Sequence, residues 1–211
     1  MDLYFSPLAC SMATRIVLNE AGGTANFINV DPKTKKLPDG ADFRAINPLG
    51  YVPVLRTDAG ELLSENAAIL QYVADRFPQA GLAPTDAWER AKLQQWLNFI
   101  ASELHRGLFT TLLDPKASAE TKAYVMEKGK WRLDYLDAHL AGREFVLDRF
   151  SVADAYLTVV LSWSRATPLD LSKWPNVKDY ASRMRKRPSV ALALEIENPL
   201  YLEEQARHRA A

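Results

Sequence analysis

The sequence predicts an α/β domain followed by an all-α domain. Short strand-like runs alternate with helical patterns only within residues 1–78. Residues 79–86, Q-A-G-L-A-P-T-D, are rich in turn-forming residues and predict a linker. From residue 87 to residue 211 strand signals are absent and helical patterns follow one another. A change of class at one linker is expected of two separate domains packed together.

The first domain alternates strands and helices. Strands are expected at residues 2–5, 27–31, 52–57 and 61–64, and helices at residues 11–21 and 65–77. The first two strands enclose the first helix, so they should be parallel with a right-handed crossover. The last two strands should form a hairpin around Asp58, Ala59 and Gly60. Gly22 and Pro78 mark the ends of the two helices.

The second domain should consist of helices separated by Pro, Gly or capping residues. They are expected near residues 87–113, 118–141, 151–166 and 175–187. Ser151 followed by Asp154 before an apolar run is a variant of the capping box. We therefore expect Asp154 to be structural and to take no part in chemistry.

Composition excludes several classes of function. The 26 acidic and 26 basic residues cancel, so electrostatic binding to nucleic acid is not expected. No apolar stretch approaches the ~20 residues that span a bilayer, and no signal peptide is recognisable. A single cysteine excludes an internal disulfide framework and fits a reducing, cytoplasmic location. Residues at metal-ligand spacing and glycine-rich nucleotide motifs are absent, so no metal is expected.

The single cysteine, Cys10, stands where a strand and a turn lead into a helix. Unpaired N–H groups and the helix dipole favour a thiolate at such a position, and the thiolate is the reactive form of sulfur. Free cysteine is also among the most buried residue types. From this segment alone, a reactive thiol and a buried core residue are equally good interpretations.

Two further segments of the first domain have both a structural and a functional interpretation. Pro53 interrupts a strand pattern, and a cis bond there would free the backbone of Val52 for a peptide-like ligand, although most X–Pro bonds are trans. Ser64, Glu65 and Asn66 precede a helix. Capping by Ser64 is the favoured interpretation, and the alternative is a site for the carboxylate and ammonium of an amino acid head group.

A polar stripe follows the predicted helix 87–113. Asn98 and His105 are seven residues apart, so in an α-helix they lie on one side, two turns from each other. A polar stripe is usually a solvated helix face, and that interpretation is favoured from these residues alone.

Six segments, taken in order, resemble the glutathione S-transferases, and most closely the bacterial beta class. The segments are L-Y-F-S-P-L-A-C-S-M-A, V-D-P-K-T-K-K, I-N-P-L-G-Y-V-P-V-L, L-L-S-E-N-A-A-I-L-Q-Y, N-F-I-A-S-E-L-H-R-G and F-S-V-A-D-A-Y. The resemblance implies a thioredoxin-like N-terminal domain and an all-helical C-terminal domain. It also implies a homodimer with glutathione as co-substrate. The tail after Leu200 is longer than is usual in the family, and the resemblance gives it no role.

The resemblance also assigns residues to glutathione. Cys10 matches the beta-class cysteine beside the glutathione sulfur, and Val52 precedes the family's cis proline and should pair its backbone with the cysteinyl part. Glu65 and Asn66 match the residues that hold the γ-glutamyl amine and carboxylate. Asn98 matches a helix residue that reaches toward Cys10.

The remaining matches concern the glycine end of glutathione and the dimer. Lys35, His105 and Arg106 match the basic group near the glycine carboxylate, and His105 is expected to be catalytic together with Cys10. Glu103 matches a residue that reaches the γ-glutamyl amine in the partner subunit. The second substrate should be an apolar electrophile, with candidate contacts at Leu8, Phe109, Leu113, Tyr156 and Trp163.

The expected reaction is attack of the glutathione thiolate on an electrophile. Thiol–disulfide exchange through Cys10 is a variant in which glutathione itself must resolve the mixed disulfide, because no second cysteine exists. The alternative from another class is a glutathione-binding or regulatory protein of the same fold with little catalysis.

Overall fold

A computed structural model describes residues 1–210 of the chain, which form two compact units. The sheet unit comprises Met1–Leu82 and the last helix, α8 (Pro188–Ala210). The helical unit comprises Ala83–Arg187. The boundary after Leu82 lies inside the predicted linker.

Four strands form the mixed sheet of the sheet unit. The strands are β1 (Asp2–Phe5), β2 (Asn26–Asn29), β3 (Val54–Arg56) and β4 (Leu62–Ser64), in the order β2-β1-β3-β4. β1 is parallel to β2 and antiparallel to β3, and β3 is antiparallel to β4. The parallel pair and the hairpin are therefore as predicted, including a turn at Gly60 with φ of 85°.

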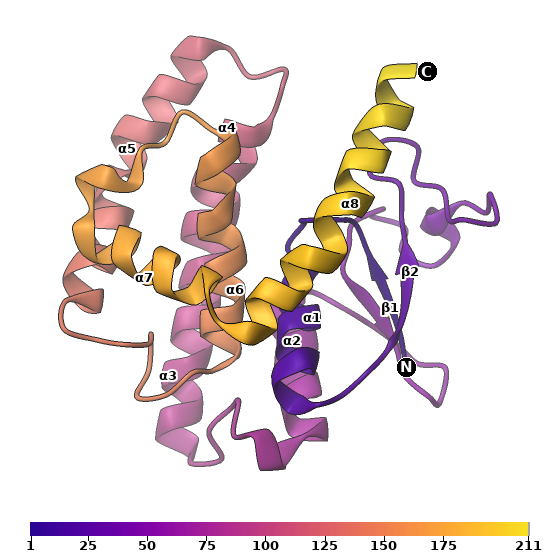
Figure 1. The fold of residues 1–211 in the computed structure, drawn as a ribbon, viewed down its shortest axis with the longest axis horizontal. Helices are drawn as coiled ribbons and strands as arrows, with labels where there is room; N and C mark the ends of the chain where they lie inside the picture. The colour runs from indigo at the N-terminus through magenta and orange to yellow at the C-terminus, as the bar shows by residue number, and fades with distance from the viewer. Residues whose placement is uncertain (211) are drawn as a thin grey trace. The chain divides into compact units, whose positions relative to one another are not determined.

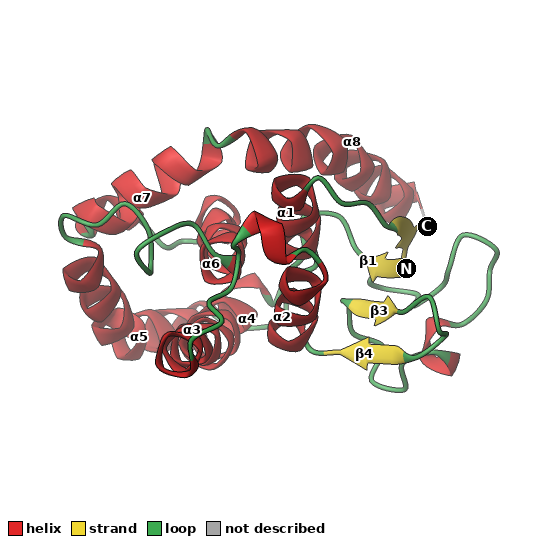
Figure 2. Cartoon of the chain, turned by 90° about the horizontal axis from the view of Figure 1, so that it is seen from below, coloured by secondary structure: helices red, strands yellow, loops and turns green. Residues whose placement is uncertain are grey.

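Each face of this sheet has its own cover. Figure 2 shows α1 (Met12–Ala21) and α2 (Asn66–Arg76) beside one face. On the other face Tyr4, Val30, Phe43 and Val54 form a buried cluster, closed by the loop that contains the short helix η1 (Phe43–Ala45). Helix α1 ends at Gly22, which has φ of 65°, as the sequence predicts. A second short helix, η2 (Pro78–Ala80), follows α2.

Helix α8 corrects one expectation from the sequence. Residues 87–211 were expected to form one all-helical domain, with no helix bounds given after residue 187. Residues 188–210 are helical, contact α1 and belong to the sheet unit (Figure 1), while residue 211 lies outside the described residues. The contact is specific: Nε of the buried Arg15 on α1 lies 2.7 Å from Oε1 of the buried Glu197 on α8. An unpaired buried charge is costly, so this pair fixes α8 on the sheet unit.

The helical unit contains α3 to α7 with short irregular helices between them. They are α3 (Ala87–Asn98), η3 (Phe99–Phe109), α4 (Thr110–Leu113), α5 (Ala119–Leu140), α6 (Val152–Ser162), η4 (Trp163–Ala166), η5 (Leu171–Lys173) and α7 (Pro175–Arg185). α6 is almost wholly buried, as its apolar sequence indicates. Within residues 1–210, no helix is both long and apolar enough to cross a membrane.

Asp154 has the structural role that the sequence predicts. Its carboxylate accepts a hydrogen bond from the Ser151 backbone at 2.9 Å, which completes the capping box of α6. It also accepts hydrogen bonds from the Val146 N–H and the Tyr180 hydroxyl, both at 2.8 Å. Burial raises the pKa of Asp154, and these hydrogen bonds oppose the rise. Asp154 therefore joins three segments of the helical unit in addition to capping α6.

Candidate functional site

Cys10 lies in the turn between β1 and α1, one residue before Ser11, the N-cap of α1. Its Sγ is 3.5 Å from the carbonyl oxygen of Val52, to which the thiol donates. Cys10 is only 9% exposed, so reagents in solution reach its sulfur less easily than they reach an exposed thiol. The thiol is therefore buried, as one of the two interpretations expects, and its reactivity stays a prediction.

The turn that carries Cys10 is held by α8. Leu8 has φ of 59°, in the left-handed region that residues with a β-carbon rarely adopt. Its N–H donates to Oε2 of Glu197 at 2.8 Å, and the other oxygen of Glu197 is paired with Arg15. Glu197 therefore fixes the backbone two residues before Cys10. Sequence analysis missed this role because no local pattern connects residues 189 positions apart.

The Val52–Pro53 peptide bond is cis, and β3 begins directly after it at Val54. Val54 is paired with Tyr4 of β1 on one side and with Ser64 of β4 on the other. This register brings three segments to one end of the sheet: the turn after β1, the residues before β3 and the residues after β4. Cys10, Val52 and the start of α2 are thus neighbours within the sheet unit.

The start of α2 differs from the favoured expectation. Ser64 ends β4 and does not cap the helix; the N-cap position is occupied by Glu65, with φ of 68° and no side-chain cap. The next residue, Asn66, is 6% exposed, and neither its Nδ2 nor its Oδ1 has a hydrogen-bond partner. A buried amide without partners is costly in a folded protein. Together with an uncapped helix start, it suits a bound carboxylate.

Lys35 contributes a cation beside Gly50 and Tyr51, the residues that precede Val52. Its backbone has φ of 60°, and its Nζ lies 5.7 Å from the centre of the Tyr51 ring. The side chain runs past Gly50, where an added β-carbon would be 3.5 Å from Cδ of Lys35. Burial, and next the charge of Arg44, lowers the pKa of Lys35 from its ordinary value. A partly desolvated ammonium beside Tyr51, the residue before Val52, is suited to a carboxylate.

The other candidates lie on one stretch of the helical unit. Asn98 ends α3, is exposed and donates to the carbonyl of Gln94 at 2.8 Å. Glu103, His105 and Arg106 lie on η3, which is a π-helix. The i→i+5 hydrogen bonds of a π-helix add residues to each turn, so residues seven apart do not align. The expected alignment of Asn98 with His105 is therefore wrong, because it assumed α-helical geometry.

His105 is enclosed by aromatic residues. Its Nδ1 is 2.8 Å from the Tyr156 hydroxyl, and its ring meets Trp163 edge to face at 4.8 Å. Burial, and next the charge of Arg106, lowers the pKa of His105 to about 4. The imidazole is therefore neutral at pH 7 and supplies no positive charge there. Of the expected contacts to an electrophile, Tyr156 and Trp163 contact His105, and Phe109 contacts Trp163.

Glu103 and Arg106 differ in their surroundings. Oε2 of Glu103 is 2.8 Å from Nε of Arg132 on α5, so this carboxylate already has a cation in its own chain. Arg106 is exposed at the protein surface. Within residues 1–210, no cluster of three or more His, Cys, Asp or Glu side chains could hold a metal ion.

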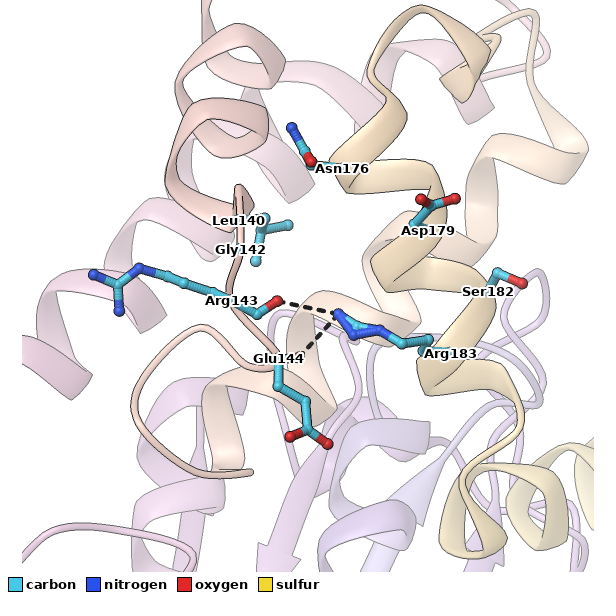
Figure 3. Close-up of a pocket in the computed structure, with 8 residues that line it drawn as sticks. All are labelled: Leu140, Gly142, Arg143, Glu144, Asn176, Asp179, Ser182 and Arg183. Atoms are coloured by element: carbon cyan, nitrogen blue, oxygen red, sulfur yellow. Dashed lines mark hydrogen bonds between the residues drawn. The ribbon is translucent and has the colours of Figure 1, made fainter.

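A hollow of about 540 Å³ lies elsewhere in the helical unit (Figure 3). It contains none of the predicted site residues. Nη2 of Arg183 donates to the carbonyl oxygens of Arg143 and Glu144, at 3.2 and 3.1 Å. The side chains that line the hollow carry both positive and negative charges, and Arg183 holds the loop after α5. This lining indicates no particular ligand or reaction.

Comparisons with known proteins place these observations in a family context. Residues 9–76 match the model of the glutathione S-transferase N-terminal domain, and residues 99–188 match that of the C-terminal domain. Glutathione S-transferase GstA of Escherichia coli O157:H7 is 41% identical over 199 residues, which cover 93% of this chain and 98% of the relative.

Two solved structures are similar over the same extent. A sphingomonad glutathione S-transferase complexed with glutathione has a TM-score of 0.88 and 42% identity, and the match covers 94% of this chain and 99% of that one. A bacterial beta class glutathione S-transferase of Sphingomonas chungbukensis has a TM-score of 0.88 and 43% identity, with 93% and 98% covered.

Proposed function

The chain belongs to the glutathione S-transferase family, and from this premise we propose how its residues bind and use glutathione. It is a glutathione transferase with glutathione as co-substrate, in keeping with its relatives and with the glutathione-bound structure that it resembles. The resemblance found in the six sequence segments is thereby confirmed. What we propose is which side chain contacts which part of glutathione and of the second substrate.

The single observation that carries the proposal is the buried, unpartnered amide of Asn66 at the uncapped start of α2. Glutathione has two carboxylates, one ammonium and one thiol. We assign the γ-glutamyl carboxylate to Asn66 and the first N–H groups of α2, and the ammonium to Glu65. The backbone of Val52 holds the cysteinyl part, and Lys35 attracts the glycine carboxylate.

This arrangement leaves the sulfur of glutathione beside Cys10. In the conjugation reaction the thiol loses its proton to solvent, and the thiolate forms a bond to an electrophilic carbon. A leaving group, where there is one, departs with its electron pair. The site contributes by orienting the thiolate and favouring its charge. His105, as a neutral hydrogen-bonding ring among Phe109, Tyr156 and Trp163, serves the electrophile, with Asn98 and Arg106 as further polar contacts.

Thiol–disulfide exchange is a second activity of the same site. Cys10 Sγ lies at the Val52 carbonyl, where the cysteinyl part of glutathione is assigned. The Cys10 thiolate attacks the glutathione sulfur of a mixed disulfide between glutathione and another thiol, that disulfide breaks, and the other thiol leaves as its thiolate. A glutathione thiolate then attacks the disulfide between Cys10 and glutathione, which releases the Cys10 thiolate and forms oxidised glutathione.

We further propose that the protein is a cytoplasmic homodimer. Tyr124, Trp131 and Tyr135 are exposed on α5 at spacings that put them on one helix face. Exposed aromatic residues in a group mark an interaction surface, and a second copy of this chain is the occupant proposed. Light scattering should give twice the mass of one chain, and Trp131→Glu should lower it. A wild-type mass of one chain at all concentrations would contradict the proposal.

The glutathione assignment is tested by calorimetry with Asn66→Ala, and with Asn198→Ala as a matched control at an exposed position of α8. A hydrogen bond to a charged group contributes about 1.5–3 kcal/mol, so Asn66→Ala should weaken glutathione binding by roughly 10- to 150-fold. The control should bind as the wild type does. Equal binding by all three proteins would remove Asn66 from the site. Turnover of an aryl halide by wild type and Cys10→Ala then separates catalysis from binding alone.

A further inference from the structure

The last turns of α8 contact the loop that carries Lys35. Nε2 of His208 lies 2.8 Å from Oδ2 of Asp31, although the two residues are 177 positions apart. Both side chains are largely enclosed, with exposed fractions of 9% for His208 and 20% for Asp31. An enclosed contact between distant segments restrains both of them more than a surface pair would.

Asp31 organises the loop from within. Its Oδ1 accepts hydrogen bonds from the N–H groups of Lys33 at 2.9 Å and Thr34 at 2.8 Å. Its own backbone carbonyl accepts from the N–H of Lys35 at 2.9 Å, and its N–H donates to Lys36 at 3.0 Å. Oδ1 of Asp31 therefore holds the turn through Lys33 and Thr34, while Oδ2 contacts His208 of α8.

The carboxylate of Asp31 is ionised at neutral pH, because its pKa is lowered. Burial acts to raise the pKa of Asp31, but the hydrogen bonds from Thr34, His208 and Lys33 outweigh it and lower this pKa to about 2. Glu204 of α8, which is buried, faces the same group, and the charges of Lys33 and Arg207 also act there. Oε2 of Glu204 has no hydrogen-bond partner among the described residues. His208 therefore stands between two acids.

The position of the Lys35 side chain depends on this turn. Lys35 keeps its φ of 60° because both of its backbone groups are bonded: its N–H to Asp31, and its carbonyl to the N–H of Phe43 at 2.8 Å. From that backbone the side chain extends past Gly50 to Tyr51, one residue before Val52. A looser turn would allow φ to relax and would withdraw the ammonium from this place.

We propose that His208 is a positioning residue of the glutathione site, which acts through Asp31 to hold Lys35 where it meets the glycine carboxylate. This inference rests on the proposed glutathione assignment and gives a role to the tail after Leu200. It predicts an effect confined to one end of the ligand, which a general loosening of the fold would not produce.

The experiment uses the full-length chain and two ligands: glutathione, and γ-glutamylcysteine, which lacks the glycine. Calorimetry compares wild type, His208→Ala, His208→Gln and Arg209→Ala, an exposed neighbour in the same turn. His208→Ala should weaken glutathione binding about five- to tenfold, and raise KM with kcat nearly unchanged. Its binding of γ-glutamylcysteine should be as in wild type. The amide of His208→Gln can still donate to Asp31 and should restore most of the affinity, and Arg209→Ala should have no effect.

A double-mutant cycle that combines His208→Ala with Lys35→Ala completes the test. If His208 acts through Lys35, His208→Ala should cost no further glutathione affinity in the Lys35→Ala background. Equal losses for both ligands, additive losses in the cycle, or unchanged glutathione binding by His208→Ala would each overturn the inference. Failure of wild type to bind glutathione would instead overturn the proposed function, so the two failures are distinguishable.

Discussion

Replacing Asp154 with alanine tests whether this residue is a helix cap or the centre of a larger network. A lost cap costs about 0.5–2 kcal/mol of stability. In the structure the Asp154 carboxylate also accepts hydrogen bonds from Val146 and Tyr180, and all of these groups are buried. Each hydrogen bond to a charged group contributes about 1.5–3 kcal/mol, and partial relaxation recovers some of it. Each buried donor left without an acceptor costs about 1–3 kcal/mol, so we expect Asp154→Ala to lose about 3–5 kcal/mol in all.

The assay is urea unfolding followed by tryptophan fluorescence, at one protein concentration because the stability of an oligomer depends on it. Asp148→Ala, at an exposed position of the preceding loop, is the control and should change stability little. Tyr180→Phe should cost stability in wild type and much less beside Asp154→Ala, where its hydroxyl has already lost its acceptor. A loss below about 2 kcal/mol would reduce Asp154 to a simple cap. Lost activity with an unchanged melting temperature would refute the structural role.

Three further predictions concern the site. Oxidised glutathione should add the mass of one glutathione to wild type and none to Cys10→Ser; an unmodified wild type after long incubation at mildly alkaline pH would count against a reactive thiol. Glu65→Gln should weaken glutathione binding by at most a few kcal/mol and scarcely affect des-amino glutathione, whereas equal losses for both ligands in calorimetry would leave Glu65 as a helix-start charge only. The pKa of His105 is lowered to about 4 in the folded chain, so below about pH 6.5 the unfolded chain binds a proton at this residue more readily than the folded chain does. The contribution of the neutral His105 ring to stability is therefore complete above about pH 6.5 and is lost as the pH falls toward 4. His105→Gln should flatten the stability profile over that range, and an unchanged slope in urea unfolding would contradict the buried neutral ring.

Local signals in the sequence predicted the parts of the fold that local physics decides. The hairpin turn at Gly60, the end of α1 at Gly22 and the capping box of Asp154 each depend on residues within a few positions. The pattern failed where distant residues decide. Helix α8 continues through Pro199, a residue that usually interrupts a helix, and no local pattern indicates that its Glu197 pairs with Arg15 on α1.

The candidate site shows the same division. The family motifs located Cys10, Val52 and Lys35, and the structure brings them to one end of the sheet unit. Three features of the site were beyond the sequence. Ser64 satisfies the composition rule for a cap but is held in β4, the π-helix changes the spacing around His105, and burial removes the charge of that ring. Composition rules carry no information about any of these.

The ion pair between Arg15 and Glu197 also has a consequence for the order in which the chain is completed during synthesis. The two residues are 182 positions apart, and at about 5–20 residues per second the ribosome needs roughly 10 to 40 seconds to pass from one to the other. Throughout that interval the guanidinium of Arg15 has no carboxylate from α8, and Leu8 lacks the acceptor that holds its backbone. The strands of the sheet unit are made first, and α8, which holds the turn before Cys10, is made last. Any chain released before residue 197 therefore carries a fully synthesised but unsupported Cys10 turn.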